Sequence, residues 1–348
     1  MPIPRADMPG TADVRIGTSG WSYPSGPGTW NGIFYPTGAR GGRAAGFDEL
    51  AYYAEHFDTV EVNSSFYRVP DPGVTATWAR RTPAGFDFSL KLYQKFTHPA
   101  MYAKGARAAP ADDAAVIPSA TRVDAEGFLR AVAPLAEAGK LGPILAQFPP
   151  SFRDSPDARD YLHWLLGVFR GHAMAVELRH RTWSDRAGET LALLGEHGAA
   201  WVQIDEPKFR FSIRQNHLPN LRGLYYMRLH GRNADKWWRH DHPDERYNYL
   251  YTPGEIDAFS DTVNTVRQIV HRLYVYLNNH FAAKAVANAA LLRHRANQPV
   301  PGPYSAEMRE RYPFLGPFVT AEGGRSDSLF GGEQEAGRPA EDAESQEG

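Results

Sequence analysis

The sequence predicts an α/β protein with a single (β/α)8 TIM-type barrel. Short apolar segments alternate with segments of helical period, and most of the apolar segments end in polar or ionisable residues. The predicted strands are residues 14–18, 59–63, 86–91, 143–147, 173–179, 200–205, 225–230 and 274–279. In such a barrel the C-terminal ends of all strands meet at one rim, where active sites lie. The alternative, an open doubly wound sheet, is disfavoured because GTSG at residues 17–20 is not a phosphate-binding loop.

The segments between the strands carry helix signals. Ser155 and Thr252 are each followed by proline, which is typical of an N-cap and a first-turn residue. Ser184 is the predicted N-cap of a third helix. Two more helices are predicted over residues 47–57 and 282–295. No helical period follows Asp205, so the sixth crossover is predicted to be degenerate.

Composition divides the chain into three parts. Residues 1–13 are predicted to be a flexible N-terminus and residues 14–320 the barrel domain. Residues 104–122, rich in Ala, Pro and Asp, are predicted to be an inserted loop after the third strand. Residues 321–348 are rich in Gly, Glu, Asp and Ser, which is the composition of a disordered acidic tail.

The overall composition excludes several classes of function. The 348 residues have a formal net charge of −2, so any site for a polyanion must be a local patch. The absence of cysteine excludes disulfides, thiolate catalysis and cysteine-ligated zinc. Neither a signal peptide nor a membrane-spanning segment is recognisable, which predicts a cytoplasmic protein that does not contact membranes.

Polar residues two positions apart near the strand ends are predicted to share the inward face of the barrel. These pairs are Glu61 with Asn63, Ser89 with Lys91, Glu177 with Arg179, Gln203 with Asp205, and Arg228 with His230. Glu61 and Glu177 are the candidate general acid and base, because two carboxylates in different environments can divide those roles. His230 is a third catalytic candidate, either as a base or as a hydrogen-bonded structural group.

The remaining candidates would bind the substrate. Lys91, Arg179 and Arg228 suit an anionic group, since guanidinium groups bind phosphate or carboxylate through two hydrogen bonds. The aromatic and other polar candidates are Trp21, Tyr23, Asn63, Phe66, Gln147, Asp205 and Asn278. Aromatic rings at this rim would stack on a sugar or a nucleobase, or they could instead pack the long loops that carry them.

A purely structural interpretation of the charged residues stays open. Glu61, Glu177, Arg179 and Arg228 could form ion pairs that close the top of the barrel, because structural networks also concentrate charge. A divalent metal held by carboxylates and imidazoles is possible but not favoured, since the chain has neither a His-x-His strand end nor a His-Glu-x-x-His helix. The possible ligands would be Glu61, Glu177, Asp205, His230 and His280. We therefore assign no metal ligand from the sequence.

A series of motifs occurs in order along the chain. They are GTSGWSY (17–23), WNGIFYP (30–36), VEVNSSFY (60–67), FSLK (88–91), LGP (141–143), QFPP (147–150), VELRH (176–180), RLHGR (228–232) and YLNNH (276–280). This series resembles the YecE-like family, known as domain of unknown function 72, over about residues 14–296. The resemblance implies a TIM-type barrel and implies no reaction, because the family has no established activity. Similarity to endonuclease IV and sugar isomerase barrels is an analogy of fold alone.

Three functions follow from these residues as hypotheses. The leading one is an enzyme of the hydrolase type that acts on a phosphate-bearing substrate, such as a nucleotide or a nucleic-acid strand, by carboxylate acid/base chemistry at the C-terminal rim. A sugar-active hydrolase or isomerase would use the same carboxylates, with the aromatic residues as sugar platforms. A non-catalytic protein that binds a nucleic-acid strand or another anionic ligand is the third. No protein partner is inferred.

Overall fold

The computed structural model describes residues 12–37, 46–104, 117–215 and 223–321. The predicted acidic tail beyond residue 321, most of the predicted N-terminal segment and residues 105–116 of the predicted insertion lie outside these ranges. Of that insertion, Lys104 ends α4 (Pro99–Lys104), residues 117–121 are irregular, and Arg122 begins α5 (Arg122–Glu137).

Parallel strands form one curved sheet, as the sequence predicts. Within the described residues its order is β6-β5-β4-β3-β2-β1-β9-β8-β7. The strands are β1 (Asp13–Ser19), β2 (Thr59–Val62), β3 (Asp87–Lys91), β4 (Leu141–Gln147), β5 (Met174–Glu177), β6 (Ala200–Trp201), β7 (Gln203–Asp205), β8 (Leu224–Leu229) and β9 (Arg272–Leu277). The two outermost strands, β6 and β7, are consecutive in sequence and are joined through Val202, whose N–H donates to the Val176 carbonyl at 2.9 Å. They are two halves of the predicted sixth strand, so the sheet is a nearly closed barrel.

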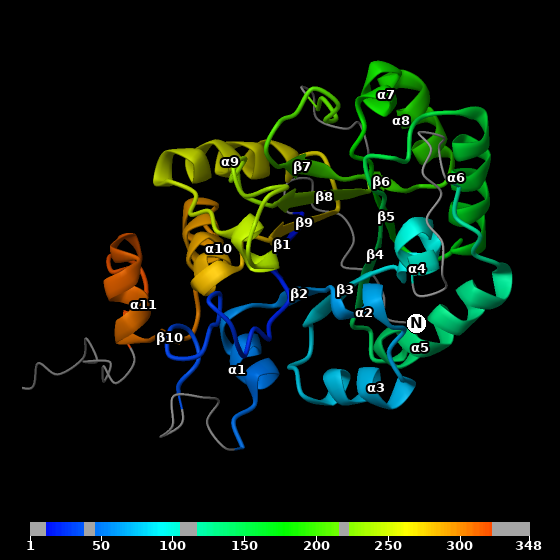
Figure 1. The fold of residues 1–348 in the computed structure, drawn as a ribbon. Helices are drawn as coiled ribbons and strands as arrows, with labels where there is room; N and C mark the ends of the chain where they lie inside the picture. The colour runs from blue at the N-terminus through cyan, green and yellow to red at the C-terminus, as the bar shows by residue number, and fades with distance from the viewer. Residues whose placement is uncertain (1–11, 38–45, 105–116, 216–222, 322–348) are drawn as a thin grey trace, which may run out of the picture.

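Helices surround this barrel (Figure 1), with α5 and α6 on one side and α9 and α10 on the opposite side. The remaining α-helices are α1 (Glu49–His56), α2 (Ser64–Tyr67), α3 (Pro72–Arg80), α6 (Pro156–Val168), α7 (Arg181–Asp185), α8 (Ala187–Glu196), α9 (Pro253–Val266), α10 (Lys284–Arg295) and α11 (Ala306–Arg311). Short 3-10 turns occur at η1 (Gln94–Phe96), η2 (Pro243–Tyr247), η3 (Phe281–Ala283) and η4 (Pro313–Leu315), and β10 (Pro303–Tyr304) pairs with β11 (Thr320–Ala321).

Two of the three predicted helix caps are present. Ser155 accepts a hydrogen bond from the Ala158 N–H, and Thr252 forms a reciprocal capping box with Glu255. The predicted cap at Ser184 is wrong, because the chain bends at Arg186 and divides the predicted helix into α7 and α8. Ser184 lies inside α7, where its hydroxyl accepts from the Arg214 N–H at 3.0 Å.

The part of the sixth crossover that the structure describes is degenerate, as predicted. The described residues between β7 and β8, 206–215 and 223, contain no helix. In this segment the Gln215 side chain accepts from the Ile204 N–H at 2.9 Å and donates to the Val202 carbonyl at 2.7 Å. It therefore satisfies backbone groups at the point where β6 and β7 are interrupted.

Three tyrosines pack together inside the barrel. Tyr226, Tyr274 and Tyr276 have ring centroids 5.3–6.2 Å apart. The Tyr276 hydroxyl is hydrogen-bonded to Thr59 at 2.6 Å and to Ser89 at 2.8 Å. Because these buried hydroxyls have partners, the barrel can hold a polar interior beneath its C-terminal rim.

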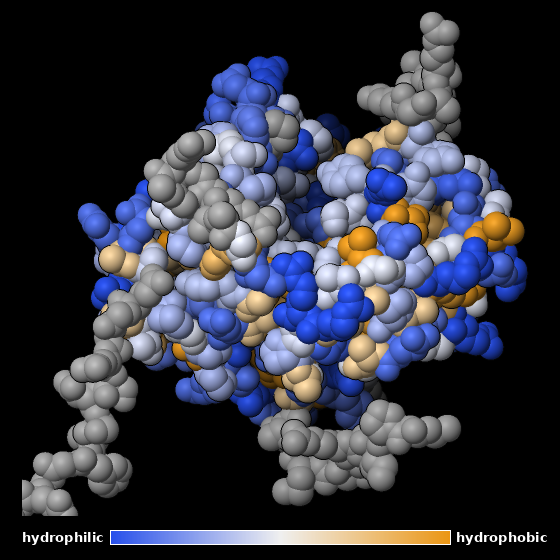
Figure 2. Space-filling model, turned by 90° about the horizontal axis from the view of Figure 1, so that it is seen from below, coloured by the Kyte–Doolittle hydropathy of each residue, from blue (hydrophilic) through white to orange (hydrophobic). Residues whose placement is uncertain are grey.

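The described helices include none that is both long and apolar enough to cross a membrane. On the face shown in Figure 2, hydrophilic residues predominate and hydrophobic residues are scattered among them. Scattered exposed apolar residues are ordinary on a protein surface.

Candidate functional site

Three buried side chains form the base of the site at the C-terminal end of the barrel. Arg228, from β8, donates to Glu61 through Nε at 2.9 Å and Nη2 at 2.6 Å, and to Glu177 through Nη1 at 2.6 Å. Glu61 and Glu177, from β2 and β5, are 0% exposed, and Arg228 is 2% exposed. We call these three residues the buried triad. The ion pairs that the sequence left open as a structural interpretation are therefore present.

Neighbouring groups complete the hydrogen bonding of the buried triad. Tyr226 donates to Glu61 at 2.6 Å, and Ser19 donates to its other oxygen at 2.8 Å. Burial alone would raise the pKa of Glu177, but Arg228 and Arg179 outweigh burial and hold that pKa well below its usual range. Glu177 is thus a carboxylate at neutral pH.

Arg179 links the buried triad to the next layer of the site. Its Nε donates to Glu177 at 2.7 Å, and its Nη1 lies 3.2 Å from Glu206. The imidazole of His230 lies beside this guanidinium, and its Nδ1 is 2.9 Å from the Asn278 amide nitrogen. Burial and the nearby Arg228 lower the pKa of His230 to about 3, so this imidazole is neutral at pH 7.

Two adjoining hollows of about 330 and 280 Å³ lie above the buried triad and together form what we call the barrel mouth. Both are lined by Tyr67, Lys91, Gln147, Arg179 and Tyr247. The larger hollow is also lined by Phe66, His98, Glu206, Phe211, Trp238 and Arg246, among others. The smaller one is also lined by Tyr23, Asn63, Arg228, His230, Asp244, Asn278 and His280.

Lys91, the last residue of β3, is a cation of the barrel mouth whose charge is not paired among the described residues, as is also true of Arg246. Its ammonium lies 4.0 Å from the centre of the Phe66 ring, and no described residue forms an ion pair or hydrogen bond with it. Burial lowers the pKa of Lys91 to about 7, and the positive charge of Arg228 contributes to the decrease. Lys91 can therefore change its protonation state near neutral pH.

The charges that reach the barrel mouth are predominantly positive. Lys91, Arg179, Arg228 and Arg246 are its described cationic lining residues, against the carboxylates Glu206 and Asp244. Glu61 and Glu177 balance the arginines from beneath and do not line either hollow. Burial raises the pKa of Glu206, although Arg179 opposes this increase.

The turn after β9 presents further polar groups to the barrel mouth. His280 stacks on Tyr23, with ring centroids 4.3 Å apart, and its buried Nδ1 has no hydrogen-bond partner among the described residues. Burial lowers the pKa of His280 to about 3. Ala282 and Ala283 follow with φ of 52° and 61°, a left-handed conformation that costs an alanine about 1–2 kcal/mol. Such strain is common at functional sites.

Most of the predicted site residues meet in or directly beneath the barrel mouth. These are Tyr23, Glu61, Asn63, Phe66, Lys91, Gln147, Glu177, Arg179, Arg228, His230 and Asn278. The prediction that Asp205 points inward needs correction. Asp205 pairs in register with Leu229, next to the inward-facing Arg228, and its carboxylate accepts from Arg232 at 2.9 Å and from Tyr251 at 2.7 Å. It lines another hollow, beside the sixth crossover, which shares Phe209 and Ser212 with the lining of the barrel mouth.

Trp21 is the other predicted contact that the structure places elsewhere. Its ring packs edge-on against Trp78 at 5.4 Å and Phe88 at 6.4 Å, and it lines neither hollow of the barrel mouth. Trp30 and Trp183 are fully buried, and their rings likewise pack against other aromatic rings of the protein core. The alternative that loop aromatics serve packing is therefore correct for these three, whereas Tyr23 and Phe66 line the barrel mouth.

Sequence reasoning missed several lining residues. Glu206 continues the inward alternation of Val202 and Ile204, and that alternation was its only signal in the sequence. His98 lies in the link between η1 and α4, and Arg246 lies in η2, so strand patterns reach neither of them. Burial, with a contribution from Lys91, lowers the pKa of His98 to about 3.

The five possible metal ligands of the barrel do not form one site. Arg228 occupies oxygens of both Glu61 and Glu177, and Asp205 is directed towards Arg232. His230 Nε2 lies 3.6 Å from Glu177, and His280 lies in the turn after β9. The polar groups that line the barrel mouth are thus mainly cations and side-chain amides. These groups donate hydrogen bonds, which suits an anion better than a metal ion.

Comparison with known proteins agrees with the barrel fold. Residues 15–310 match the family described as "Protein of unknown function DUF72". The chain belongs to this family. The resemblance seen in the sequence motifs is thereby confirmed, together with the barrel fold.

Relatives and solved structures extend the comparison. The chain is 26% identical to the UPF0759 protein YunF of Bacillus subtilis over 287 residues, which cover 79% of this chain and 92% of YunF. It is 28% identical to the UPF0759 protein YecE of Escherichia coli K12, over 55% of this chain and 59% of YecE. A crystal structure of a DUF72 family protein from Thermotoga maritima has a TM-score of 0.66 at 30% identity, covering 82% of this chain and all of that one. One from Enterococcus faecalis has a TM-score of 0.68 at 24% identity, covering 82% of this chain and 96% of that one, and bears on the fold alone.

Proposed function

We propose that the barrel mouth binds a phosphate-bearing substrate and that the protein is an enzyme acting on it. The observation that carries this proposal is that cationic side chains line the cavity, whereas the two buried glutamates lie below it. Lys91 and Arg179 face the cavity, while Glu61 and Glu177 lie beneath it and are occupied by Arg228. An incoming anion therefore meets cations first.

The size of the electrostatic attraction supports this choice of ligand. A unit charge about 4 Å from a cation near a protein surface gains about 4 kcal/mol at an effective dielectric constant of about 20. The Lys91 ammonium has no described counter-ion that an anion would have to displace. Arg179 is 16% exposed and offers further N–H donors, although Glu177 and Glu206 share its charge.

The aromatic lining indicates what the phosphate would be attached to. Phe66, Tyr67 and Trp238 line the larger hollow, and Tyr67 and Trp238 are 65% and 55% exposed. Trp238 lies 6.2 Å from Phe211 between ring centroids. Exposed rings beside cations suit the stacking of a nucleobase, so a nucleotide or a nucleic-acid strand is the substrate class that we propose.

The contacts favour Lys91 over the two glutamates as the group that exchanges a proton with the substrate. Glu61 and Glu177 serve as fixed counter-charges of Arg228, and neither reaches the cavity. Lys91 has a pKa of about 7, close to the value at which a general acid or base is most effective at neutral pH. In this proposal Lys91 binds the phosphate as an ammonium and then donates its proton to the leaving oxygen of the substrate, which leaves Lys91 as the amine.

A non-catalytic binding protein is a second candidate. It is favoured by one observation, the full burial of both glutamates, because a binding site needs no group that cycles through two protonation states. A sugar-active enzyme fits less well, since a neutral sugar would leave the Lys91 ammonium without a partner.

Calorimetric titration of the full chain tests the proposal. Pyrophosphate, adenosine monophosphate and uncharged adenosine would be titrated into the wild type, Lys91→Met and Lys208→Met at pH 6.5. Lys208 is an exposed lysine that lines the hollow at Asp205, so it is a matched control. We expect both phosphates to bind more tightly than adenosine. We also expect Lys91→Met to weaken phosphate binding at least about tenfold, with Lys208→Met unchanged.

Two results would count against the proposal. Equal affinity of the wild type and Lys91→Met for pyrophosphate would mean that the anion does not bind at Lys91. Affinity for adenosine equal to that for its monophosphate would mean that the phosphate is not recognised. If the phosphates bind and a panel of phosphate esters is not turned over, the binding-protein candidate replaces the enzyme.

A further inference from the structure

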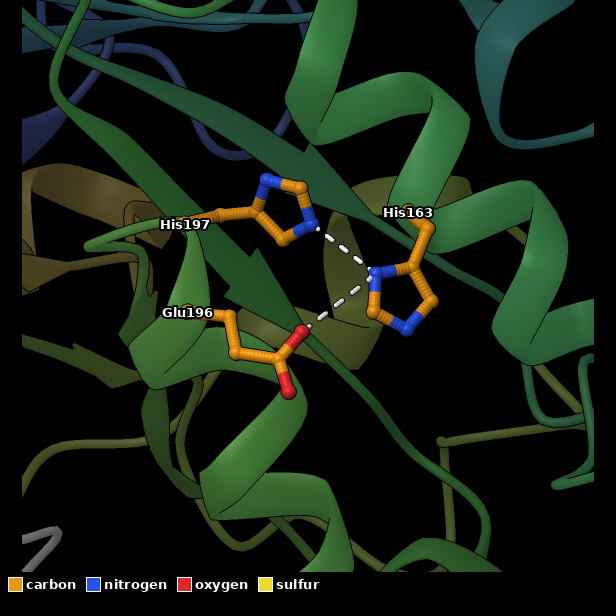
Figure 3. A group of neighbouring side chains, drawn as sticks. All are labelled: His163, Glu196 and His197. Atoms are coloured by element: carbon orange, nitrogen blue, oxygen red, sulfur yellow. Dashed lines mark hydrogen bonds and ion pairs between the residues drawn. The ribbon is translucent and has the colours of Figure 1, made fainter.

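A second group of ligand-type side chains lies outside the barrel mouth, where α6 passes the C-terminal end of α8. His163 is on α6, Glu196 is the last residue of α8, and His197 is the C-cap of α8. Figure 3 shows their ring nitrogens and one carboxylate oxygen directed towards one another. His163 and Glu196 are exposed and His197 is half-buried, so solvent and ions can reach the group.

The distances match the requirements of a bound transition metal. His163 Nδ1 lies 3.0 Å from His197 Nε2 and 3.8 Å from Glu196 Oε2, and all three ligand atoms lie within 4.8 Å of one another. Metal–ligand bonds of about 2.0–2.1 Å at a tetrahedral angle separate two ligand atoms by about 3.3 Å. The two nitrogens are therefore close to the spacing that one ion would impose, and the exposed glutamate needs only a small side-chain movement.

The chemistry of the group also favours a metal ion. Two imidazoles and one carboxylate form a donor set that zinc uses in proteins. In the present hydrogen bond one of the two facing nitrogens donates a proton and the other accepts it through its lone pair. Moving the donor's proton to the opposite nitrogen of its own ring would present a lone pair from each ring to an ion. The ion would also lie at the C-terminal end of α8, where the helix dipole favours positive charge.

We propose that His163, Glu196 and His197 bind one zinc ion, which links α6 to the C-terminal end of α8. The ion has three protein ligands, and water completes its coordination because the site is open to solvent. It stabilises the folded chain, since an ion that binds the native state and not the unfolded chain shifts the folding equilibrium by mass action. This inference does not depend on the function of the barrel mouth.

Zinc binding to the full chain, free of any affinity tag and treated with chelator, tests the inference. Isothermal titration would be performed on the wild type, His163→Ala, His197→Ala, Glu196→Gln and His271→Ala. His271 is an exposed histidine in the turn before β9 and serves as the matched control. We expect one zinc per chain in the wild type and in His271→Ala. Because loss of groups that only support a metal ligand already costs about 10- to 100-fold in affinity, loss of either ligand histidine should cost at least as much.

A second readout separates the proposed ion from adventitious binding. Zinc should raise the unfolding temperature of the wild type and of His271→Ala, and should leave that of His163→Ala unchanged. Zinc affinity in His163→Ala and His197→Ala equal to that of the wild type would place the ion elsewhere and overturn the inference. The absence of zinc binding by the wild type would overturn it as well.

Discussion

The two ends of the barrel each contain an arginine among carboxylates, and they differ in what lies beside it. At the N-terminal end, Arg15 donates to Asp13 at 2.8 Å and to the Gly85 carbonyl at 2.6 Å, with Asp87 at 3.9 Å. At the C-terminal end, Arg228 is bound just as completely by Glu61 and Glu177. Only at this end does a cation without a described counter-ion, Lys91, lie beside an arginine network and line a cavity.

This difference shows which feature marks function. A charged network inside a barrel meets a structural need at either end, because buried ions require partners. Unpaired donors that face a cavity have no structural purpose, and in TIM-type barrels active sites lie at the C-terminal end. The candidate residues of greatest functional interest are therefore Lys91 and its neighbours in the lining, rather than the buried triad.

Removing the central arginine at each end should have the largest effect. Arg228→Met leaves two buried carboxylates without their cation and is expected to cost about 3–5 kcal/mol of unfolding free energy. Arg15→Met should cost less, because Asp13 and Asp58 are 42% and 41% exposed and can be solvated. Urea unfolding of both variants and of the wild type measures the two losses. An Arg228→Met loss no larger than that of Arg15→Met would contradict the comparison.

The tyrosines that support the two networks should have a smaller effect. Tyr226→Phe removes a 2.6 Å hydrogen bond to Glu61, and we expect a loss of about 1.5–3 kcal/mol, the range for hydrogen bonds to charged groups. Tyr274→Phe removes the corresponding 2.8 Å bond to Asp87 at the opposite end, and it should also destabilise the chain. Neither variant should change phosphate affinity. A Tyr226→Phe variant of normal stability that fails to bind phosphate would instead place Tyr226 in the binding site.

The smallest effect should come from the carboxylate in the lining of the barrel mouth. Glu206→Gln removes a negative charge and frees Arg179 Nη1, so phosphate affinity should increase by roughly two- to tenfold. Glu189→Gln is the control, since Glu189, on α8, pairs with Arg186 at the bend before that helix, outside the barrel mouth. Titration with pyrophosphate measures both variants. A fall in the affinity of Glu206→Gln would show that this carboxylate takes part in binding.

The sequence was sufficient to predict the barrel and most of the residues that meet in or beneath the barrel mouth. Strand-end polarity and two-residue alternation placed Glu61, Glu177 and Arg228 together, because those strands carry charge on one face only. The alternation failed at residues 200–205. There the outward face, which a crossover helix would normally cover, carries Gln203 and Asp205, while the inward face carries Val202 and Ile204. In a parallel barrel both faces are buried, so polarity alone did not identify the inward face.

The pairing of the charges could not be predicted from the sequence either. Three cations and two glutamates were expected at the rim. The residues around them in the sequence do not indicate that Arg228 bridges both glutamates or that Lys91 has no described ion-pair partner. That arrangement depends on the register of strands far apart in the chain. It decides which candidates act on a ligand and which hold the barrel together.

The most direct test of the central claim is the pH dependence of anion affinity. Sulfate is a suitable probe because its charge is constant between pH 5.5 and pH 9, and His98, His230 and His280, with pKa values of about 3, stay neutral throughout. Because Lys91 loses its proton near pH 7, sulfate affinity of the wild type should fall above that pH, by up to about tenfold per pH unit. In Lys91→Met the affinity should be lower and should not show this fall. A flat profile in the wild type, or the same fall in Lys91→Met, would contradict the role assigned to Lys91.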